Sequence, residues 1–155
     1  SAVCLELFTN GGCASLGKCL VKHWNMTQST ISLSSGEAEL HGIAQGAAQS
    51  LGIQSLLKDL GWSVAVNVHS DATAAIGICR RKGLGKIRHL DTTDLWIQDA
   101  CRSKKIQVLK VDGKSNMADA LTKYVDRPTL EMALKKMGLE RLEGRPACAP
   151  VAVGA

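Results

Sequence analysis

A change in the spacing of apolar residues constrains the fold more than any other feature of this sequence. Residues 30–34 and 64–68 alternate apolar and polar residues, which is typical of half-buried strands. Between them, apolar residues recur at helical spacing after Ser34 and Glu37, which form a capping box. The helical set is Leu40, Ile43, Ala44, Ala47, Ala48 and Leu51. The pattern predicts a long helix from about Gly36 to Leu60.

The remaining patterns predict further strands and helices. We expect two short strands around residues 3–24, joined by a tight turn at Asn10-Gly11, where both residues tolerate positive φ. Another strand is expected at residues 106–111, and helices at residues 73–81, 90–103 and 116–124. This order of strands and helices predicts an α/β domain, a mixed sheet with helices packed on it.

Composition and length indicate one globular domain with a tail. The 155 residues are 45% hydrophobic and 21% charged, which excludes wholesale disorder. No apolar stretch approaches the roughly 18 residues of a membrane-spanning helix, and no secretory leader is visible. We therefore expect an intracellular protein, cytoplasmic or nuclear, without membrane partners and with its six cysteines reduced.

The charge balance favours a polyanionic partner, because the net charge is +5. The aromatic residues are Phe8, Trp24, Trp62, Trp96 and Tyr124. They are too few to stack successive bases of a single strand. Recognition of a duplex through its backbone fits this chain better.

Three acidic residues stand out by their positions. Glu39 lies in the first turns of the long helix, Asp71 ends a strand, and Asp119 lies in the first turn or two of the last core helix. Each also has a purely structural interpretation: a favourable charge at a helix N-terminus, an N-cap, and an i,i+4 ion pair with Lys123. If the sheet brings the three together, they need a cation, and hard oxygen ligands suit magnesium.

Several segments taken together carry the motifs of a known family. They include Ser34-Ser35-Gly36-Glu37-Ala38-Glu39 and Ala118-Asp119-Ala120-Leu121-Thr122-Lys123, with the strand-end Asp71 between them. The segments are residues 9–12, 20–24, 30–40, 68–75, 86–91 and 117–123. In this order they resemble the ribonuclease H domain of copia-type retrotransposon Pol polyproteins over about residues 9–125.

The resemblance implies a three-layer ribonuclease H-like fold and an endonuclease that hydrolyses the RNA strand of an RNA–DNA hybrid. By the family pattern, Glu39, Asp71 and Asp119 are the catalytic residues and the ligands of two Mg²⁺ ions. One ion lowers the pKa of the attacking water and the other stabilises the leaving 3′ oxygen. RNA is selected through its 2′-hydroxyls. The second implied partner is the reverse transcriptase part of the same polyprotein.

The resemblance also divides the chain into parts. Residues 1–8 are unmatched, residues 9–125 form the ribonuclease H-like domain, and residues 126–142 form a C-terminal helix. Residues 143–155 are small and contain proline and glycine, so we expect a disordered tail.

Two departures from the family pattern matter. The first metal-binding Asp of the family lies on the first strand, about forty residues before the Glu, and would fall before Ser1. Either the first central strand is missing, which we favour, or residues 3–8 take its place and Glu6 substitutes for the Asp. The turn at residues 111–116 also lacks the histidine of cellular ribonucleases H. A catalytically inactive remnant that binds nucleic acid is therefore the alternative function.

A basic run follows the helix expected at residues 73–81. Its members are Arg80, Arg81, Lys82, Lys86, Arg88 and His89. One interpretation is a solvated surface loop. The other is contact with the phosphates of the hybrid, which the family position favours. His89 could equally serve packing or a helix cap.

A competing signal lies at the N-terminus. Cys4, Cys13, Cys19 and His23 have the C-x8-C-x5-C-x3-H spacing of tristetraprolin-like zinc fingers, and four such ligands make a closed zinc site. The same residues also fit paired strands with small buried cysteines. We therefore keep an RNA-binding zinc module as the less favoured alternative.

Overall fold

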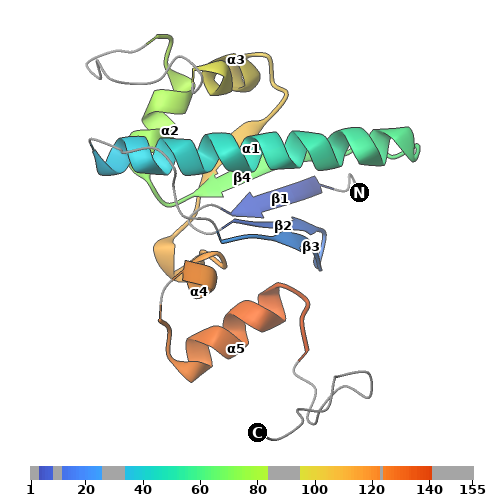
Figure 1. Ribbon diagram of the computed structural model, residues 1–155, viewed down its shortest axis with the longest axis vertical. Helices are drawn as coiled ribbons and strands as arrows, with labels where there is room; N and C mark the ends of the chain where they lie inside the picture. The colour runs from blue at the N-terminus through green and yellow to red at the C-terminus, as the bar shows by residue number, and fades with distance from the viewer. Residues whose placement is uncertain (1–3, 9–11, 26–33, 84–94, 123, 141–155) are drawn as a thin grey trace, which may run out of the picture.

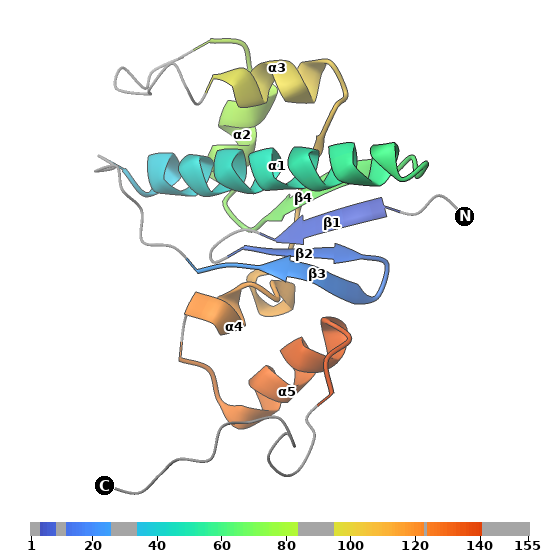
Figure 2. The same ribbon diagram turned by 45° about the vertical axis from the view of Figure 1, so that its right-hand side comes forward.

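A five-stranded mixed sheet in the order β3-β2-β1-β4-β5 forms the central layer of the domain. The structure is a computed structural model that describes residues 4–8, 12–25, 34–83, 95–122 and 124–140. Helices cover both faces of the sheet, with α1, α2 and α3 on one side and α4 and α5 on the other (Figure 1, Figure 2). The predicted α/β class with a mixed sheet is confirmed.

The strands fall into an antiparallel and a parallel half. They are β1 (Cys4–Phe8), β2 (Cys13–Leu16), β3 (Cys19–His23), β4 (Ala65–Ser70) and β5 (Gln107–Lys110). β1, β2 and β3 form an antiparallel meander, whereas β1, β4 and β5 are parallel. We expected two strands before residue 24, and the structure has three. A turn at Gly17 divides the segment expected to form the second strand into β2 and β3. Gly17 has a φ of +62°, which favours glycine.

The strand β1 occupies the central position of the sheet, between β2 and β4. Leu5 pairs with Val66 of β4 and is fully buried. The favoured expectation of a missing central strand is therefore wrong, and the alternative that this segment takes the position is confirmed. The Asn10-Gly11 turn lies outside the described residues.

The helix α1 (Ser35–Asp59) matches the prediction closely. The Glu37 N–H donates to Ser34 Oγ at 3.2 Å, so Ser34 is the predicted N-cap. Its apolar face buries Leu40 and Ile43 against the sheet. The strand expected at residues 30–34 lies outside the described residues, apart from Ser34 itself.

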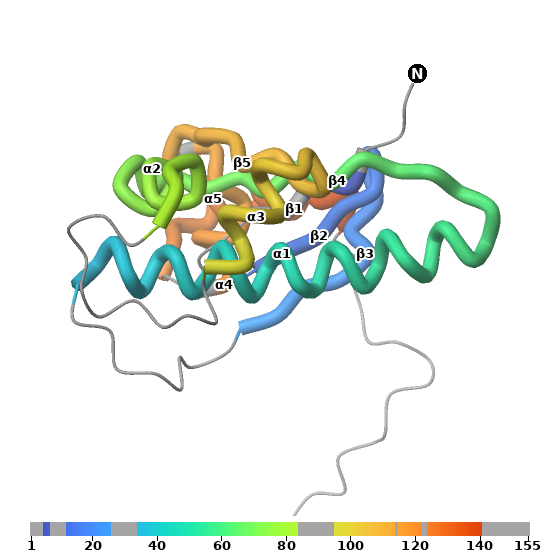
Figure 3. Tube along the Cα trace, turned by 90° about the horizontal axis from the view of Figure 1, so that it is seen from above, coloured from blue at the N-terminus to red at the C-terminus, as the bar shows by residue number. Residues whose placement is uncertain are grey.

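The helices α2 (Thr73–Arg80) and α3 (Trp96–Arg102) complete the layer of α1, and α2 packs against both neighbours (Figure 3). The expected helix at 73–81 is confirmed within one residue. The helix expected at residues 90–103 is described only from Trp96 onward, since residues 84–94 lie outside the described part of the chain.

The opposite face carries a 3-10 turn, η2 (Gly113–Ser115), then α4 (Asp119–Thr122) and α5 (Arg127–Lys136). A second apolar cluster joins them to the sheet and contains Cys13, Met117, Ala118 and Met137, with Leu20 and Leu121 packed against it. The helix predicted at residues 116–124 is described only as a single turn that begins at Asp119, and Asn116 forms a side-chain turn before it. The Asn116 side-chain oxygen accepts from Ala118 N at 3.2 Å.

The C-terminal helix is shorter than the predicted range of residues 126–142. It ends at Lys136, and Gly138 follows with a φ of +69°, which stops the helix. Leu20 N donates to Met137 O at 3.2 Å, so α5 is attached directly to β3. The expected tail lies outside the described residues. None of the helices in the described segments has the length and apolar character needed to cross a membrane.

Two glycines with similar positive φ differ in their surroundings. Substituting each with alanine therefore distinguishes the free-energy cost of backbone strain from the cost of overpacking. Gly12 has a φ of +65°, and a methyl group there would overlap the indole ring of Trp24, whereas nothing lies near Gly17. We expect Gly17→Ala to lower the free energy of unfolding by about 1 kcal/mol. Gly12→Ala should cost about 1–3 kcal/mol more. Urea unfolding of both variants checks this, and equal losses would contradict the Trp24 contact.

Candidate functional site

The carboxyl ends of β1, β4 and β5 lie at one edge of the sheet, because these strands are parallel. α1 begins at this edge, toward which the arrows of β1 and β4 point (Figure 1). A methyl group at Gly36 would contact Ala74 Cβ at 3.6 Å, so the first turn of α1 packs on the first turn of α2. Open α/β sheets bind ligands at such an edge.

Asp71 directly follows β4 at this edge. The N-cap of α2 is Ala72 rather than Asp71, and Ser70 Oγ accepts from Ala72 N at 3.2 Å. The N-cap interpretation of Asp71 is therefore wrong. The Asp71 side chain instead reaches across to η2, where a methyl group at Gly113 would lie 3.6 Å from its Oδ2 atom.

Asp119 is oriented by the same turn. Asn116, which is 5% exposed, donates from Nδ2 to Asp119 Oδ1 at 3.2 Å, and its backbone N–H donates to Gly113 O at 3.2 Å. Gly113, Asn116 and Asp119 line one cavity of about 300 Å³ together with residues of α5. The η2 turn thus connects the surroundings of Asp71 and Asp119. Lys123, the alternative partner of Asp119, lies outside the described residues.

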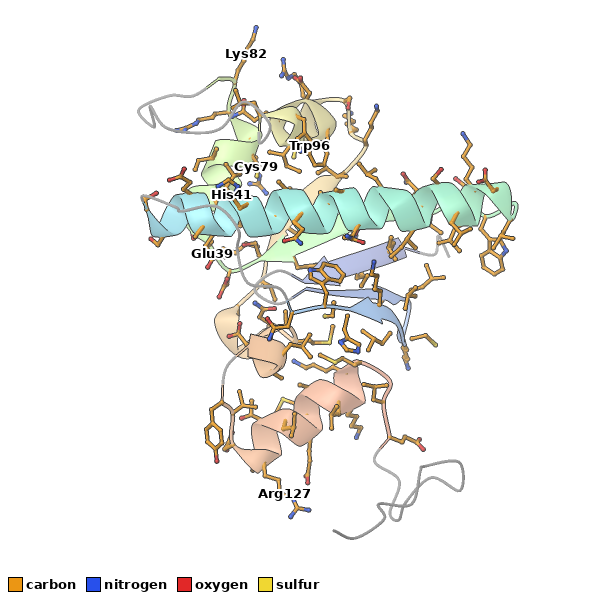
Figure 4. All side chains as sticks on the ribbon, viewed as in Figure 1. Glu39, His41, Cys79, Lys82, Trp96 and Arg127 are labelled. Atoms are coloured by element: carbon orange, nitrogen blue, oxygen red, sulfur yellow. The ribbon has the colours of Figure 1, made fainter. Side chains whose placement is uncertain are left out.

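Glu39 approaches from α1. It lies on the side of α1 that faces the sheet, while His41 lies toward α2 (Figure 4). The Oε2 atom of Glu39 is shielded from solvent. The three acidic residues therefore come from three elements that meet at one edge of the sheet.

The ligand type of these residues suits magnesium, but their arrangement does not form a magnesium site. Carboxylate oxygens are the ligands that Mg²⁺ prefers. Within the described segments, however, no three His, Cys, Asp or Glu side chains form a group that could hold a metal ion. Glu39, Asp71 and Asp119 share an edge without forming a ready metal site.

Two residues of β4 engage the Glu6 carboxylate. Its Oε1 accepts from Asn67 Nδ2 at 3.0 Å, and its Oε2 contacts His69 Nε2 in a short hydrogen bond. Glu6 is level with Asn67 in the β1–β4 register, and His69 pairs with Phe8, the last residue of β1. The carboxylate is thus held by residues two and four positions before Asp71, and its substitution for the Asp of the family stays a prediction. The sequence offered a signal for this cluster, since Asn67 and His69 alternate with the buried valines of β4.

The four residues of the possible zinc site are spread over the meander. Cys13 pairs with His23 at one end of the β2–β3 hairpin, and Cys19 pairs with Leu16 at the other end. Cys13 is fully buried and Cys19 is exposed. Cys4 lies on β1, opposite Ala65 of β4. The hairpin therefore places Cys19 at the opposite end from Cys13 and His23, and the described residues form no group of three that could bind zinc.

Only the first part of the basic run, Arg80 to Lys82, is described, and Lys86, Arg88 and His89 lie outside the described residues. The Arg80 guanidinium donates to Val108 O at 2.9 Å, which ties the end of α2 to β5. Arg81 and Lys82 follow at the mouth of a cavity of about 240 Å³ between α2 and α3. Arg102 of α3 lines the same cavity, and no pattern in the sequence groups it with the run.

Gln98 holds the end of this run in place. Its Oε1 accepts from Gly83 N at 2.8 Å, and its Nε2 donates to Ile78 O at 3.0 Å and to Gly83 O at 3.1 Å. Gln98 is 4% exposed, so these bonds are made largely out of water. Sequence reasoning missed this residue, because a lone glutamine in a helix usually faces solvent.

Two thiols lie behind the basic residues in the same cavity. Burial raises the pKa of Cys79 to about 12, with a further contribution from nearby Cys101. Burial also raises the pKa of Cys101. Both thiols stay protonated at neutral pH, so neither acts as a nucleophile there.

Comparison with known proteins places the chain beside plant retrotransposon polyproteins. It is 26% identical over 114 residues to the retrovirus-related Pol polyprotein from transposon TNT 1-94 of Nicotiana tabacum, covering 72% of this chain and 9% of that protein. The polyproteins from transposons RE1 and RE2 of Arabidopsis thaliana are 26% identical over 137 residues and 25% identical over 146 residues. These matches cover 86% and 92% of this chain and 9% and 10% of the polyproteins.

The chain thus spans about a tenth of the length of these curated relatives and is similar to one region of retrotransposon Pol polyproteins. No family model matches the chain, and no solved structure matches it.

Gln98 provides a test of how the basic run is held. We expect Gln98→Ala to lower the free energy of unfolding by about 2 kcal/mol, because the polar groups of Ile78 and Gly83 lose their partner. Trypsin should then cleave faster after Arg81 and Lys82. Gln49→Ala is the matched control, because the bond that Gln49 accepts from Lys22 is exposed to solvent. It should change stability by less than about 0.5 kcal/mol. Equal effects of the two variants would refute the role of Gln98.

Proposed function

We propose that this chain is a ribonuclease H-like region of a retrotransposon Pol polyprotein and hydrolyses the RNA strand of an RNA–DNA hybrid. The proposal is carried by the positions of three acidic residues around a sheet ordered β3-β2-β1-β4-β5. Asp71 directly follows β4, Glu39 lies in the second turn of α1, and Asp119 begins α4 after the η2 turn. The similarity to Pol polyproteins supports the same function, since reverse transcription produces RNA–DNA hybrids. The reverse transcriptase part of such a polyprotein is the proposed partner.

The residues of the edge have distinct tasks in this proposal. Asp71 and Asp119 provide carboxylates on the two sides of the η2 turn, and Asn116 fixes the orientation of Asp119. Glu39 provides a third carboxylate from α1. Magnesium is the cofactor that the resemblance implies; the carboxylate chemistry supports it, whereas the arrangement of the three side chains does not.

A second candidate function is nucleic-acid binding without hydrolysis. Two observations favour it. The Glu6 carboxylate is already engaged by Asn67 and His69, and the described residues form no three-ligand metal group. The basic cavity between α2 and α3 would then be the functional part of the domain.

Replacement of Asp71 tests the catalytic proposal. We expect Asp71→Asn to lower the rate of cleavage of a labelled RNA–DNA hybrid by at least about a hundredfold, which is ~2.7 kcal/mol. The fold should persist, because Asp71 does not cap α2. The measurement is the initial cleavage rate with magnesium and with EDTA, together with circular dichroism.

Asp112→Asn is the matched control. Asp112 lies two residues after β5, is exposed, and makes no side-chain cap bond, so its variant should cleave at the wild-type rate. Cleavage that is insensitive to Asp71→Asn would remove this residue from the site. Tight hybrid binding without any cleavage by the wild-type chain would support the second candidate.

A further inference from the structure

We propose that the cavity between α2 and α3 is a phosphate subsite that binds one backbone phosphodiester of a nucleic-acid strand. The assignment rests on the proposed nucleic-acid function and extends it to a defined pocket. Arg102 of α3, together with Arg81 and Lys82 after α2, forms its binding groups.

The charge of the cavity supports an anionic ligand. Four cationic side chains line it, namely Arg80, Arg81, Lys82 and Arg102. In the part of the chain that the structure describes, no acidic side chain lines this cavity. Four cations around about 240 Å³ repel one another, and an anion in the cavity relieves that repulsion.

The cavity is built from fixed parts, which lowers the entropy lost on binding. The Arg80 guanidinium is held on Val108 O and leaves further N–H donors unused by that bond. The backbone at Gly83 is held by buried Gln98. Lys82 extends from this fixed end of α2, away from the sheet (Figure 4).

Arg102 has a competing partner that a phosphate can displace. Its guanidinium contacts Asp99, three residues earlier on α3. The two side chains are 55% and 77% exposed, so the pair is a surface ion pair of small net stability. A phosphodiester bound in the cavity accepts from the same guanidinium without the loss of a buried bond.

The position of the cavity suits a strand that also reaches the acidic edge. Asp71 lies just before the first residue of α2, and Arg80 is its last residue. Eight helical residues span about 12 Å. A duplex rises about 3.4 Å per step. A duplex along α2 therefore places the bound phosphate about three to four steps from the bond at Asp71.

Binding of a labelled RNA–DNA hybrid to the full chain tests the subsite. Fluorescence anisotropy in EDTA at several salt concentrations gives Kd and its salt dependence without need of cleavage. We expect Arg102→Ala to raise Kd about fivefold to tenfold and to reduce the salt slope by about 1. Arg102→Lys should recover part of the affinity.

Lys105→Ala is the matched control, because Lys105 is also exposed and lies three residues after Arg102 but outside this cavity. It should bind the hybrid as the wild-type chain does. An unchanged Kd and salt slope for Arg102→Ala, or an equal loss for Lys105→Ala, would overturn the subsite. Failure to bind any hybrid would overturn it as well.

Measurements of inorganic phosphate binding and of hybrid cleavage distinguish this proposal from a free-anion site and from the hydrolytic function. If inorganic phosphate binds in an Arg102-dependent manner while the hybrid does not, the cavity takes a free anion and the backbone assignment is wrong. If the hybrid binds through Arg102 but is never cleaved, the subsite is upheld and the hydrolytic function fails. If cleavage depends on Asp71 while Arg102→Ala binds normally, the hydrolytic function is upheld and the subsite fails.

Discussion

The parallel pairing of β1 with β4 is the contact on which the rest of the structure depends. It joins an antiparallel meander to a parallel pair that begins about sixty residues later in the sequence, and it aligns Leu5 with Val66. The buried side chains of these two strands form the surface on which Leu40 and Ile43 of α1 pack. The same pairing aligns the carboxyl ends of the strands. The edge of the sheet near Glu39, Asp71 and Asp119 therefore depends on the long-range pairing of β1 with β4.

Local patterns predicted the elements that depend on local energetics. α1 was identified from its apolar period and its Ser34 cap, both of which act within one helix. The place of β1 is not predictable in this way, because a five-residue strand pairs equally well with many strands and only the packed core selects one register. The same limit explains α5, whose end follows from Gly138 and its contact with β3 and not from its own apolar pattern.

The candidate site also combines features set by local patterns with features set by tertiary contacts. Asp71 follows the predicted strand and Asp119 lies in the predicted helical segment, because both positions depend on local patterns. Their role in a site stays a prediction. The engagement of Glu6 depends on Asn67 and His69, which are more than sixty positions away in the sequence. Arg102 joins the basic run only through the packing of α3 on α2. Contacts of this kind arise from tertiary structure, so a pattern within one element does not reveal them.

The separation of acidic and basic groups along α2 has a physical consequence for any polyanionic ligand. The carboxylates at the beginning of α2 repel a phosphate backbone, and this repulsion opposes approach to the edge. The cations at the end of α2 provide a compensating attraction about 12 Å away, far enough that exposed charges at the two ends are largely screened from each other at physiological salt. In the proposed subsite, the α2–α3 cavity therefore supplies affinity at a distance from the carboxylates. In such a layout, binding and chemistry depend on different residues and respond differently to salt.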